Sequence, residues 1–207
     1  MKKTIRSFLL LVLAVTLAAG LAVAPEASAK KKSALETSVE NIVNAKVEKS
    51  AAKKAKLRTL FDYVTGSEDG KENFGYKGAR PTIVKGKAVK AWTKKGWPAK
   101  FAAEMISKKT GSCYHYAAIY GYLAKKATGY SVRVCVGKTN GFTGKLQDHA
   151  WTEIKIGKTW YVCDTNLDKT LSNLGKKKAG TYFLKKRSSL KKTYNKYKKV
   201  KTYTVKF

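Results

Sequence analysis

Acidic residues, histidines and cysteines are scarce in this sequence. Its 207 residues include 44 lysines and arginines, but 13 acidic residues, two histidines and three cysteines, which gives a formal net charge of +31 at pH 7. Structural zinc sites need clustered cysteines and histidines, commonly spaced C-x-x-C, and no such cluster occurs. The Gly137-Lys138-Thr139 stretch also lacks the first glycine of a phosphate-binding loop. We therefore predict neither a metal site nor another cofactor.

The sequence has one long apolar run, at the N-terminus, and no second one. A basic segment at 2–6 precedes an apolar run at 8–23, and Ala27-Ser28-Ala29 provides a small-residue cleavage site. This order is typical of a secretory signal peptide, residues 1–29. A membrane anchor is the alternative, because the run approaches the length of a short span; Pro25 and the small residues after it favour cleavage. We expect a secreted protein that is extracellular or associated with the cell wall.

Arginine is rare although the chain is strongly basic. After residue 29 the sequence contains four arginines, which are Arg58, Arg80, Arg133 and Arg187. Lysine supplies the remaining positive charge. Arginine binds phosphates and base edges through paired hydrogen bonds, so its scarcity argues against specific nucleic-acid binding. A diffuse lysine coat favours adhesion to polyanions. For an exported protein these are anionic cell-wall polymers or a membrane surface.

The chain after the signal peptide is long enough for one domain with a proper core. Residues 30–56 form a basic segment, in which Ser33-x-x-Glu36 resembles a capping box and 45–56 either continues a helix or acts as a linker. Residues 57–185 carry the main periodic elements. The basic extension 186–207 is expected to pack on this domain, because 202–207, like 182–184, has a strand-like pattern.

The best-defined helix begins at Ser112 or Cys113, and Gly129 provides its C-terminal cap. Three strands are predicted after it, at 131–136, 148–156 and 159–164. Gly157-Lys158 suits a two-residue type II′ hairpin, which pairs residue 156 with residue 159.

This register places His149 and Asp164 on one face of the sheet as diagonal neighbours, with β-carbons roughly 7 Å apart. It turns Cys163 to the other face. Cys113 must then come from the helix packed on the face that carries His149. A helix N-terminus favours the thiolate form and offers backbone N–H groups for an oxyanion. A thiol needs a base, and the base needs a carboxylate to fix its tautomer, so these residues can fill the roles of a catalytic triad.

The other candidate residues have simpler interpretations. Cys135 and Cys163 fit small buried core residues. A disulfide between them is the alternative, although a three-strand meander would place the His149 strand between them, beyond the reach of a disulfide. His115 lies about 200° around the helix from Cys113, which favours a structural role.

Three segments together resemble the bacterial transglutaminase-like superfamily: Gly111-Ser112-Cys113-Tyr114-His115-Tyr116-Ala117, His149-Ala150-Trp151-Thr152-Glu153 and Trp160-Tyr161-Val162-Cys163-Asp164. The resemblance implies an α+β fold with a papain-like core, in which the nucleophile helix packs on an antiparallel sheet and N-terminal helices precede it. The transglutaminase-like domain would span 57–185.

By this resemblance Cys113 is the catalytic nucleophile, His149 the base and later the acid, and Asp164 the orienting carboxylate. A tryptophan upstream of the cysteine completes the oxyanion hole in some members, which makes Trp92 and Trp97 candidates. The glutamine that papain-type enzymes carry six residues before the cysteine is replaced by Ser107. The few acidic residues argue against the calcium sites of the animal enzymes.

The resulting hypothesis is a secreted thiol enzyme that acts on peptide or isopeptide amides through a thioester. Protease, transamidase and deamidase activities all remain open, because the outcome depends on whether water or an amine resolves the thioester. The alternative is a non-catalytic, basic cell-surface or cell-wall module that retains the fold and binds polyanions.

Overall fold

The computed structural model describes residues 31–67, 72–78, 82–84, 87–90, 92, 94–190 and 197–207. The predicted signal peptide and Arg80 lie outside these residues. From Lys32 onward the chain forms one compact unit. Among the described residues, no helix combines the length and apolar character that crossing a membrane requires.

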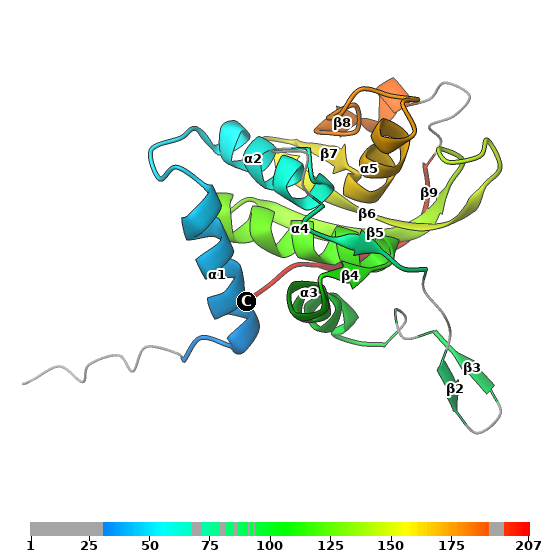
Figure 1. The fold of residues 1–207 in the computed structure, drawn as a ribbon, viewed down its shortest axis with the longest axis horizontal. Coiled ribbons are helices and arrows are strands. Elements are labelled where there is room, and N and C mark those ends of the chain that lie inside the picture. Colours follow the sequence, from blue (N-terminus) through cyan, green and yellow to red (C-terminus); the bar gives the residue numbers. More distant parts are fainter. Residues whose placement is uncertain are drawn as a thin grey trace, which may run out of the picture. The chain divides into compact units, whose positions relative to one another are not determined.

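The architecture is α+β, as the resemblance implied. The described helices are α1 (Ala34–Lys46), α2 (Lys53–Thr65), α3 (Trp97–Lys108), α4 (Cys113–Thr128) and α5 (Thr165–Asn173), with a short 3-10 helix at Arg187–Leu190. Figure 1 shows α4 lying along the sheet, with α1, α2 and α3 around it.

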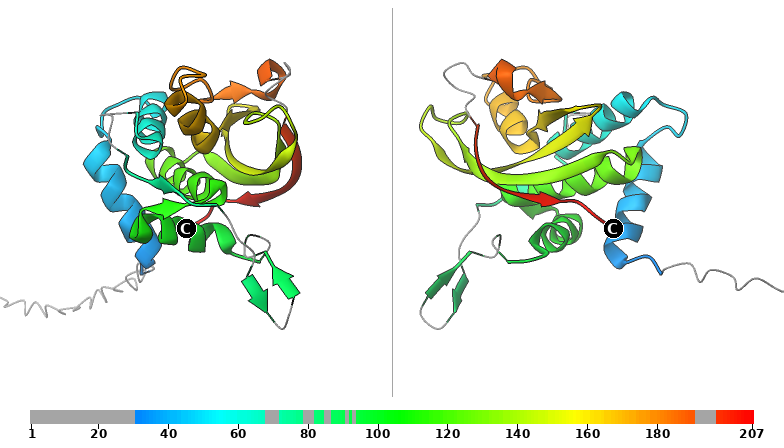
Figure 2. Two further views of the ribbon diagram at one scale, coloured as in Figure 1. Left: turned by 45° about the vertical axis from the view of Figure 1, so that its right-hand side comes forward. Right: turned by 180° about the vertical axis from the view of Figure 1, so that it is seen from behind.

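The main sheet has five strands in the order β8-β7-β6-β5-β9, every neighbouring pair antiparallel, and it is strongly curled (Figure 2). Its strands are β5 (Ser131–Thr139), β6 (Gln147–Ile156), β7 (Thr159–Cys163), β8 (Lys185–Lys186) and β9 (Tyr197–Thr204). Two small pairs accompany it: β1 (Gly75–Tyr76) runs parallel to β4 (Thr110–Gly111), and β2 (Thr82–Val84) pairs with β3 (Lys87–Val89).

Helix α4 has the ends that the sequence predicts. Ser112 is its N-terminal cap, and Gly129 ends it with φ 70°, a left-handed conformation that glycine adopts without strain. Lys125 Nζ donates to the carbonyls of Gly129 and Tyr130, both at 3.2 Å, which satisfies acceptors beyond the last turn. The helix is buried along most of its length, so it forms the centre of the core.

The β6–β7 hairpin also has the predicted register. Ile156 pairs with Thr159, and Thr152 pairs with Cys163. Gly157 has φ 58°, whereas Lys158 is not among the residues with positive φ, and this combination is the one a type II′ turn requires. A single glycine therefore fixes which residues of the two strands face each other.

Several predicted boundaries are wrong. Residues 182–184 form a turn rather than a strand, and Leu184 adopts φ 47°, which interrupts an extended chain. Strand β7 ends at Cys163, one residue early, because Asp164 caps α5. Near the N-terminus, α1 ends at Lys46 and α2 begins at Lys53, so within 45–56 the stretch 47–52 connects the two helices and the rest belongs to them.

A buried ion cluster ties the sheet to the segment after β8. The Glu153 carboxylate has no exposed surface; it accepts hydrogen bonds from Arg133 at 2.6 and 2.8 Å, from Arg187 Nε at 2.9 Å and from Trp151 Nε1 at 3.0 Å. Burial alone would raise the pKa of Glu153, but these donors lower it overall. The carboxylate is thus compensated by two cations from different parts of the fold.

We expect Glu153→Gln to lower the free energy of unfolding by about 3–5 kcal/mol, because two arginines lose the charge that compensates them inside the protein. Urea unfolding followed by tryptophan fluorescence measures the change. Glu48→Gln, at an exposed position of the same residue type, is the matched control and should change stability by less than about 0.5 kcal/mol. A loss below about 1 kcal/mol for Glu153→Gln would contradict this account of the cluster.

Candidate active site

Cys113 is the first residue of α4, and contacts of the preceding residues Gly111 and Ser112 with His115 fix its position. The Ser112 backbone N–H donates to His115 Nδ1 at 3.1 Å, and the His115 ring stacks on Phe101 with centroids 4.2 Å apart. A β-carbon on Gly111 would lie 2.5 Å from the His115 side chain, so this tight entry requires glycine. His115 therefore has the structural role that its position on the helix predicts.

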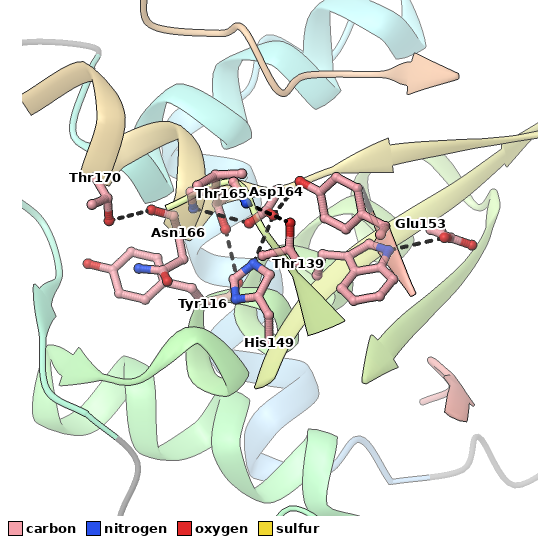
Figure 3. A network of polar contacts seen from close by, with 12 residues as sticks. Tyr116, Thr139, His149, Glu153, Asp164, Thr165, Asn166 and Thr170 are labelled. Carbon is pink, nitrogen blue, oxygen red and sulfur yellow. Dashed lines mark hydrogen bonds and ion pairs between the residues drawn. The ribbon is translucent and has the colours of Figure 1, made fainter. Parts of the chain in front are cut away.

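His149 and Asp164 form a direct hydrogen bond. His149 Nε2 lies 2.8 Å from Asp164 Oδ2, and each side chain is 1% exposed. Asp164 caps α5, where its Oδ1 accepts the Leu167 backbone N–H at 3.1 Å. Figure 3 shows the His149 ring directed at this carboxylate. Because Nε2 is hydrogen-bonded to Asp164, Nδ1 is the ring nitrogen that can exchange a proton with a thiol.

The surroundings of His149 favour its protonated form. Burial alone would lower the pKa of His149, but the charge and hydrogen bond of Asp164, followed by the Cys113 thiol, raise it to about 10. The ring is also enclosed by aromatic side chains, edge-on to Phe142 with centroids 5.1 Å apart and near-parallel to Trp151. An imidazolium beside Cys113 is the partner that a thiolate needs.

The prediction that α4 packs on the sheet face carrying His149 is wrong. The Thr152 hydroxyl donates to the Ala117 carbonyl of α4 at 2.7 Å, so α4 covers the face of Thr152. Side chains alternate along a strand, which puts His149 on the opposite face. Pairing between β6 and β7 stops at Thr152 and Cys163, so His149 lies three residues beyond it. Here β6 pairs with β5 alone, and Cys113 from α4 and Asp164 at the start of α5 both come close to the histidine.

A cavity of about 540 Å³ opens at this point and is lined by both Cys113 and His149. The start of β6, one face of α5 and the side chains of Glu72, Tyr76 and Phe142 form its other walls. Tyr76 is 57% exposed, so the cavity communicates with solvent. The wall is mixed in character, with aromatic, amide and charged groups around the sulfur.

The two other cysteines are free and buried outside this cavity. Burial raises the pKa of the Cys163 thiol to about 12, despite hydrogen bonds from the Leu184 backbone and the Tyr120 hydroxyl. Burial likewise raises the pKa of Cys135 far above its ordinary value. Neither thiol is suited to act as a nucleophile near neutral pH, and no disulfide joins them.

The structure does not bring the predicted oxyanion-hole tryptophans into the cavity. Trp92 stacks on Tyr114 with centroids 4.6 Å apart, and Trp97 is 2% exposed within the aromatic packing of α3. The Trp97 indole nitrogen is buried without a hydrogen-bond partner among the described residues. Neither tryptophan lines the cavity that contains Cys113.

Sequence reasoning missed α5 and the cavity wall that it forms. The sequence does contain the features that predict this helix. Asp164 is a favourable N-terminal cap, and the apolar residues Leu167 and Leu171 lie four residues apart. The helix directs Asn166 and Lys169 toward the cavity. The Lys169 ammonium is 3.0 Å from Glu72 and its side chain is only 7% exposed. Within the described residues, no group of three or more histidine, cysteine or acidic side chains is arranged to hold a metal ion.

The raised pKa of His149 predicts a specific pH dependence of stability. The folded protein binds a proton that the unfolded chain releases near pH 6.5, and it keeps that proton up to about pH 10. Stability from this proton is therefore complete below pH 6.5 and is lost as the pH rises through about 10. We expect the difference in unfolding free energy between the wild type and His149→Asn to shrink over that range, as measured by urea unfolding at several pH values.

His115→Asn is the control for this measurement, because burial lowers the pKa of His115 below its ordinary value. Its difference from the wild type should stay constant between pH 6.5 and 10. A constant difference for His149→Asn as well would show that His149 holds no extra proton.

The part of the chain that contains these residues matches a known family. The family model for the transglutaminase-like superfamily matches residues 39–165, which include Cys113, His149 and Asp164. A search of curated protein sequences found no significant match.

Two solved structures resemble this chain at low identity. A candidate cysteine protease from Cytophaga hutchinsonii is 12% identical, with a TM-score of 0.42 over 82% of this chain and 50% of that one. A TGase is 13% identical, with a TM-score of 0.41 over 68% of this chain and 35% of that one. The chain thus spans half or less of the length of either. The family assignment comes from the family model, which covers more than half of the sequence: this chain belongs to the transglutaminase-like superfamily.

Proposed function

We propose that this protein is an exported thiol enzyme that acts on peptide or isopeptide amides, with Cys113, His149 and Asp164 as its catalytic residues. The observation that carries this proposal is the buried 2.8 Å hydrogen bond between His149 and Asp164, at a cavity that Cys113 also lines. A nucleophile, a base and an orienting carboxylate are the three parts of a thiol triad.

In the first half of the reaction the Cys113 sulfur attacks the carbonyl carbon of the amide. A sulfur–carbon bond forms, and negative charge develops on the carbonyl oxygen. His149 then gives its Nδ1 proton to the amide nitrogen, the carbon–nitrogen bond breaks, and the amine leaves. The enzyme is left as a thioester on Cys113, with neutral His149 still hydrogen-bonded to Asp164.

In the second half, water or a primary amine attacks the thioester carbon. His149 accepts the proton of the attacking group, the carbon–sulfur bond breaks, and the thiolate–imidazolium pair is restored. Water yields a carboxylic acid, which means proteolysis for a backbone amide and deamidation for a glutamine side chain. An amine yields a new amide. The exposed rim of the cavity at Tyr76 and Leu174 gives either acceptor access.

The negative charge on the carbonyl oxygen needs donors, and the first turn of α4 supplies them. The first N–H groups of a helix have no carbonyl partner within the helix, and its dipole favours negative charge at this end. We assign the backbone N–H of Cys113 to this role. We assign no such role to Trp92 or Trp97, because neither lines the cavity that contains Cys113.

We infer where the enzyme acts from the charge of the chain. Removal of residues 1–29 takes away Lys2, Lys3, Arg6 and Glu26, so 41 of the 44 basic and 12 of the 13 acidic residues remain. Lysine charge would hold the exported protein on anionic cell-wall polymers or a membrane surface, and salt screens this attraction. Its substrate is then a protein or peptide at the cell surface. A non-catalytic module would share the charge and the fold, so the thiol chemistry separates the two functions.

Incubation of the protein with a glutamine-containing peptide and a primary amine tests the proposal. Mass spectrometry distinguishes a gain of the amine, a shift of about one dalton and a cut chain, and each result selects one reaction. We expect one of these products from the wild type, none from Cys113→Ala, and a rate about 10²- to 10⁴-fold lower from His149→Ala.

Cys135→Ala is the matched control, since it removes a buried thiol outside the cavity. It should retain the wild-type reaction. If Cys113→Ala forms product as fast as the wild type, or if neither protein reacts while both bind an anionic polymer in a salt-sensitive manner, the non-catalytic function replaces the proposal.

A further inference from the structure

The Asp164 carboxylate has a third partner, which comes from the C-terminal strand. The Tyr197 hydroxyl donates to Asp164 Oδ2 at 2.7 Å, and this is the same oxygen that binds His149. Tyr197 is the first residue of β9 and lies outside the region 39–165 that matches the family model. The contact therefore joins the site to a part of the chain beyond that region.

The structure holds Tyr197 in place through β5. Tyr197 pairs with Thr139, and the β5–β9 register shifts between Val136 and Gly137. A β-carbon on Gly137 would lie 2.0 Å from the Lys198 carbonyl oxygen, so glycine is needed for β9 to approach this closely. The Tyr197 ring also packs edge-on against Trp151, with centroids 4.9 Å apart. Both its backbone and its ring are fixed beside the carboxylate.

We infer that Tyr197 is a positioning residue for the Asp164–His149 pair, so that strand β9 completes the active site. The inference rests on the proposed function, in which that pair serves Cys113.

The hydrogen bonds of the carboxylate explain what the tyrosine does. Asp164 Oδ1 accepts the Leu167 N–H, and Oδ2 accepts from both His149 and Tyr197. Donors on both oxygens fix the plane of the carboxylate. Burial and the charge of Asp164 raise the pKa of Tyr197 well above 10, so the phenol keeps its proton and acts as a donor.

Because Asp164 Oδ2 accepts from two donors, its hydrogen bond to His149 is weaker than it would be with one donor. Without the phenol, Oδ2 would accept more strongly from His149 Nε2, and the imidazolium would hold its Nδ1 proton more firmly. It would then give that proton less readily to the leaving amine. Tyr197 thus adjusts the acid strength of His149 without touching the substrate.

Tyr197→Phe tests this role, because it removes the hydroxyl and keeps the ring. We expect kcat to fall roughly tenfold with KM unchanged, the effect of losing one hydrogen bond to a charged group. Proton NMR at neutral pH should show the His149 Nε2–H resonance moving downfield as its bond to Asp164 strengthens. The chain has two histidines, and a His115→Asn background assigns the signal.

Tyr203→Phe is the matched control: Tyr203 lies on the same strand but packs against Trp97. It should keep the wild-type kcat and resonance. The inference is overturned if Tyr197→Phe has a kcat within about twofold of the wild type, or if the His149 resonance stays in place or moves upfield. A lowered melting temperature with an unchanged resonance overturns it too, since that is the result of a purely structural role.

The two readouts separate this inference from the proposed function. The NMR resonance needs only the folded protein, so it tests the link from Tyr197 to His149 even if no peptide is turned over. Loss of the proposed function would appear as wild-type activity in Cys113→Ala, whatever the resonance shows.

Discussion

The hydrogen bond between His149 and Asp164 is the interaction around which the site is built. Both side chains are almost fully buried, and burying a charged pair is costly unless every partner is satisfied. The Leu167 N–H and the Tyr197 hydroxyl supply the remaining donors to the carboxylate. Three elements therefore meet at this pair: β6 provides the histidine, the N-terminal cap of α5 provides the carboxylate, and β9 provides the phenol. Helix α4 then needs only to bring its first residue, Cys113, to the same cavity.

The basic residues divide into two groups with different physical roles. Arg58, Arg133 and Arg187 each bind a carboxylate, and Arg133 and Arg187 each do so through two nitrogens of the planar guanidinium. Lysine carries nearly all the remaining positive charge, and many of these side chains are exposed. The three described arginines thus serve the fold, whereas the exposed lysines give the surface the charge on which the proposed adhesion to anionic polymers depends.

The parts of the site that could be predicted from the sequence are those fixed by local chemistry. Gly157 sets the hairpin and hence the register of the His149 strand, and Ser112 and Gly129 set the ends of the Cys113 helix. The missed parts depend on contacts between distant segments. The face on which α4 packs follows from the core as a whole, and Tyr197 reaches Asp164 only because β9 returns to pair with β5. Helix α5 was hidden for another reason, since Asp164 serves as both the end of a strand pattern and a helix cap.

In the proposed reaction Cys113 carries a covalent intermediate that His149 and Asp164 help to form. Acid quenching of the protein with a reactive peptide ester, followed by intact-mass measurement and peptide mapping, detects that intermediate most directly. We expect one acyl group, the peptide minus its leaving alcohol, on Cys113 and none on Cys135 or Cys163. An adduct on another residue, or no adduct while the peptide is consumed, would contradict it.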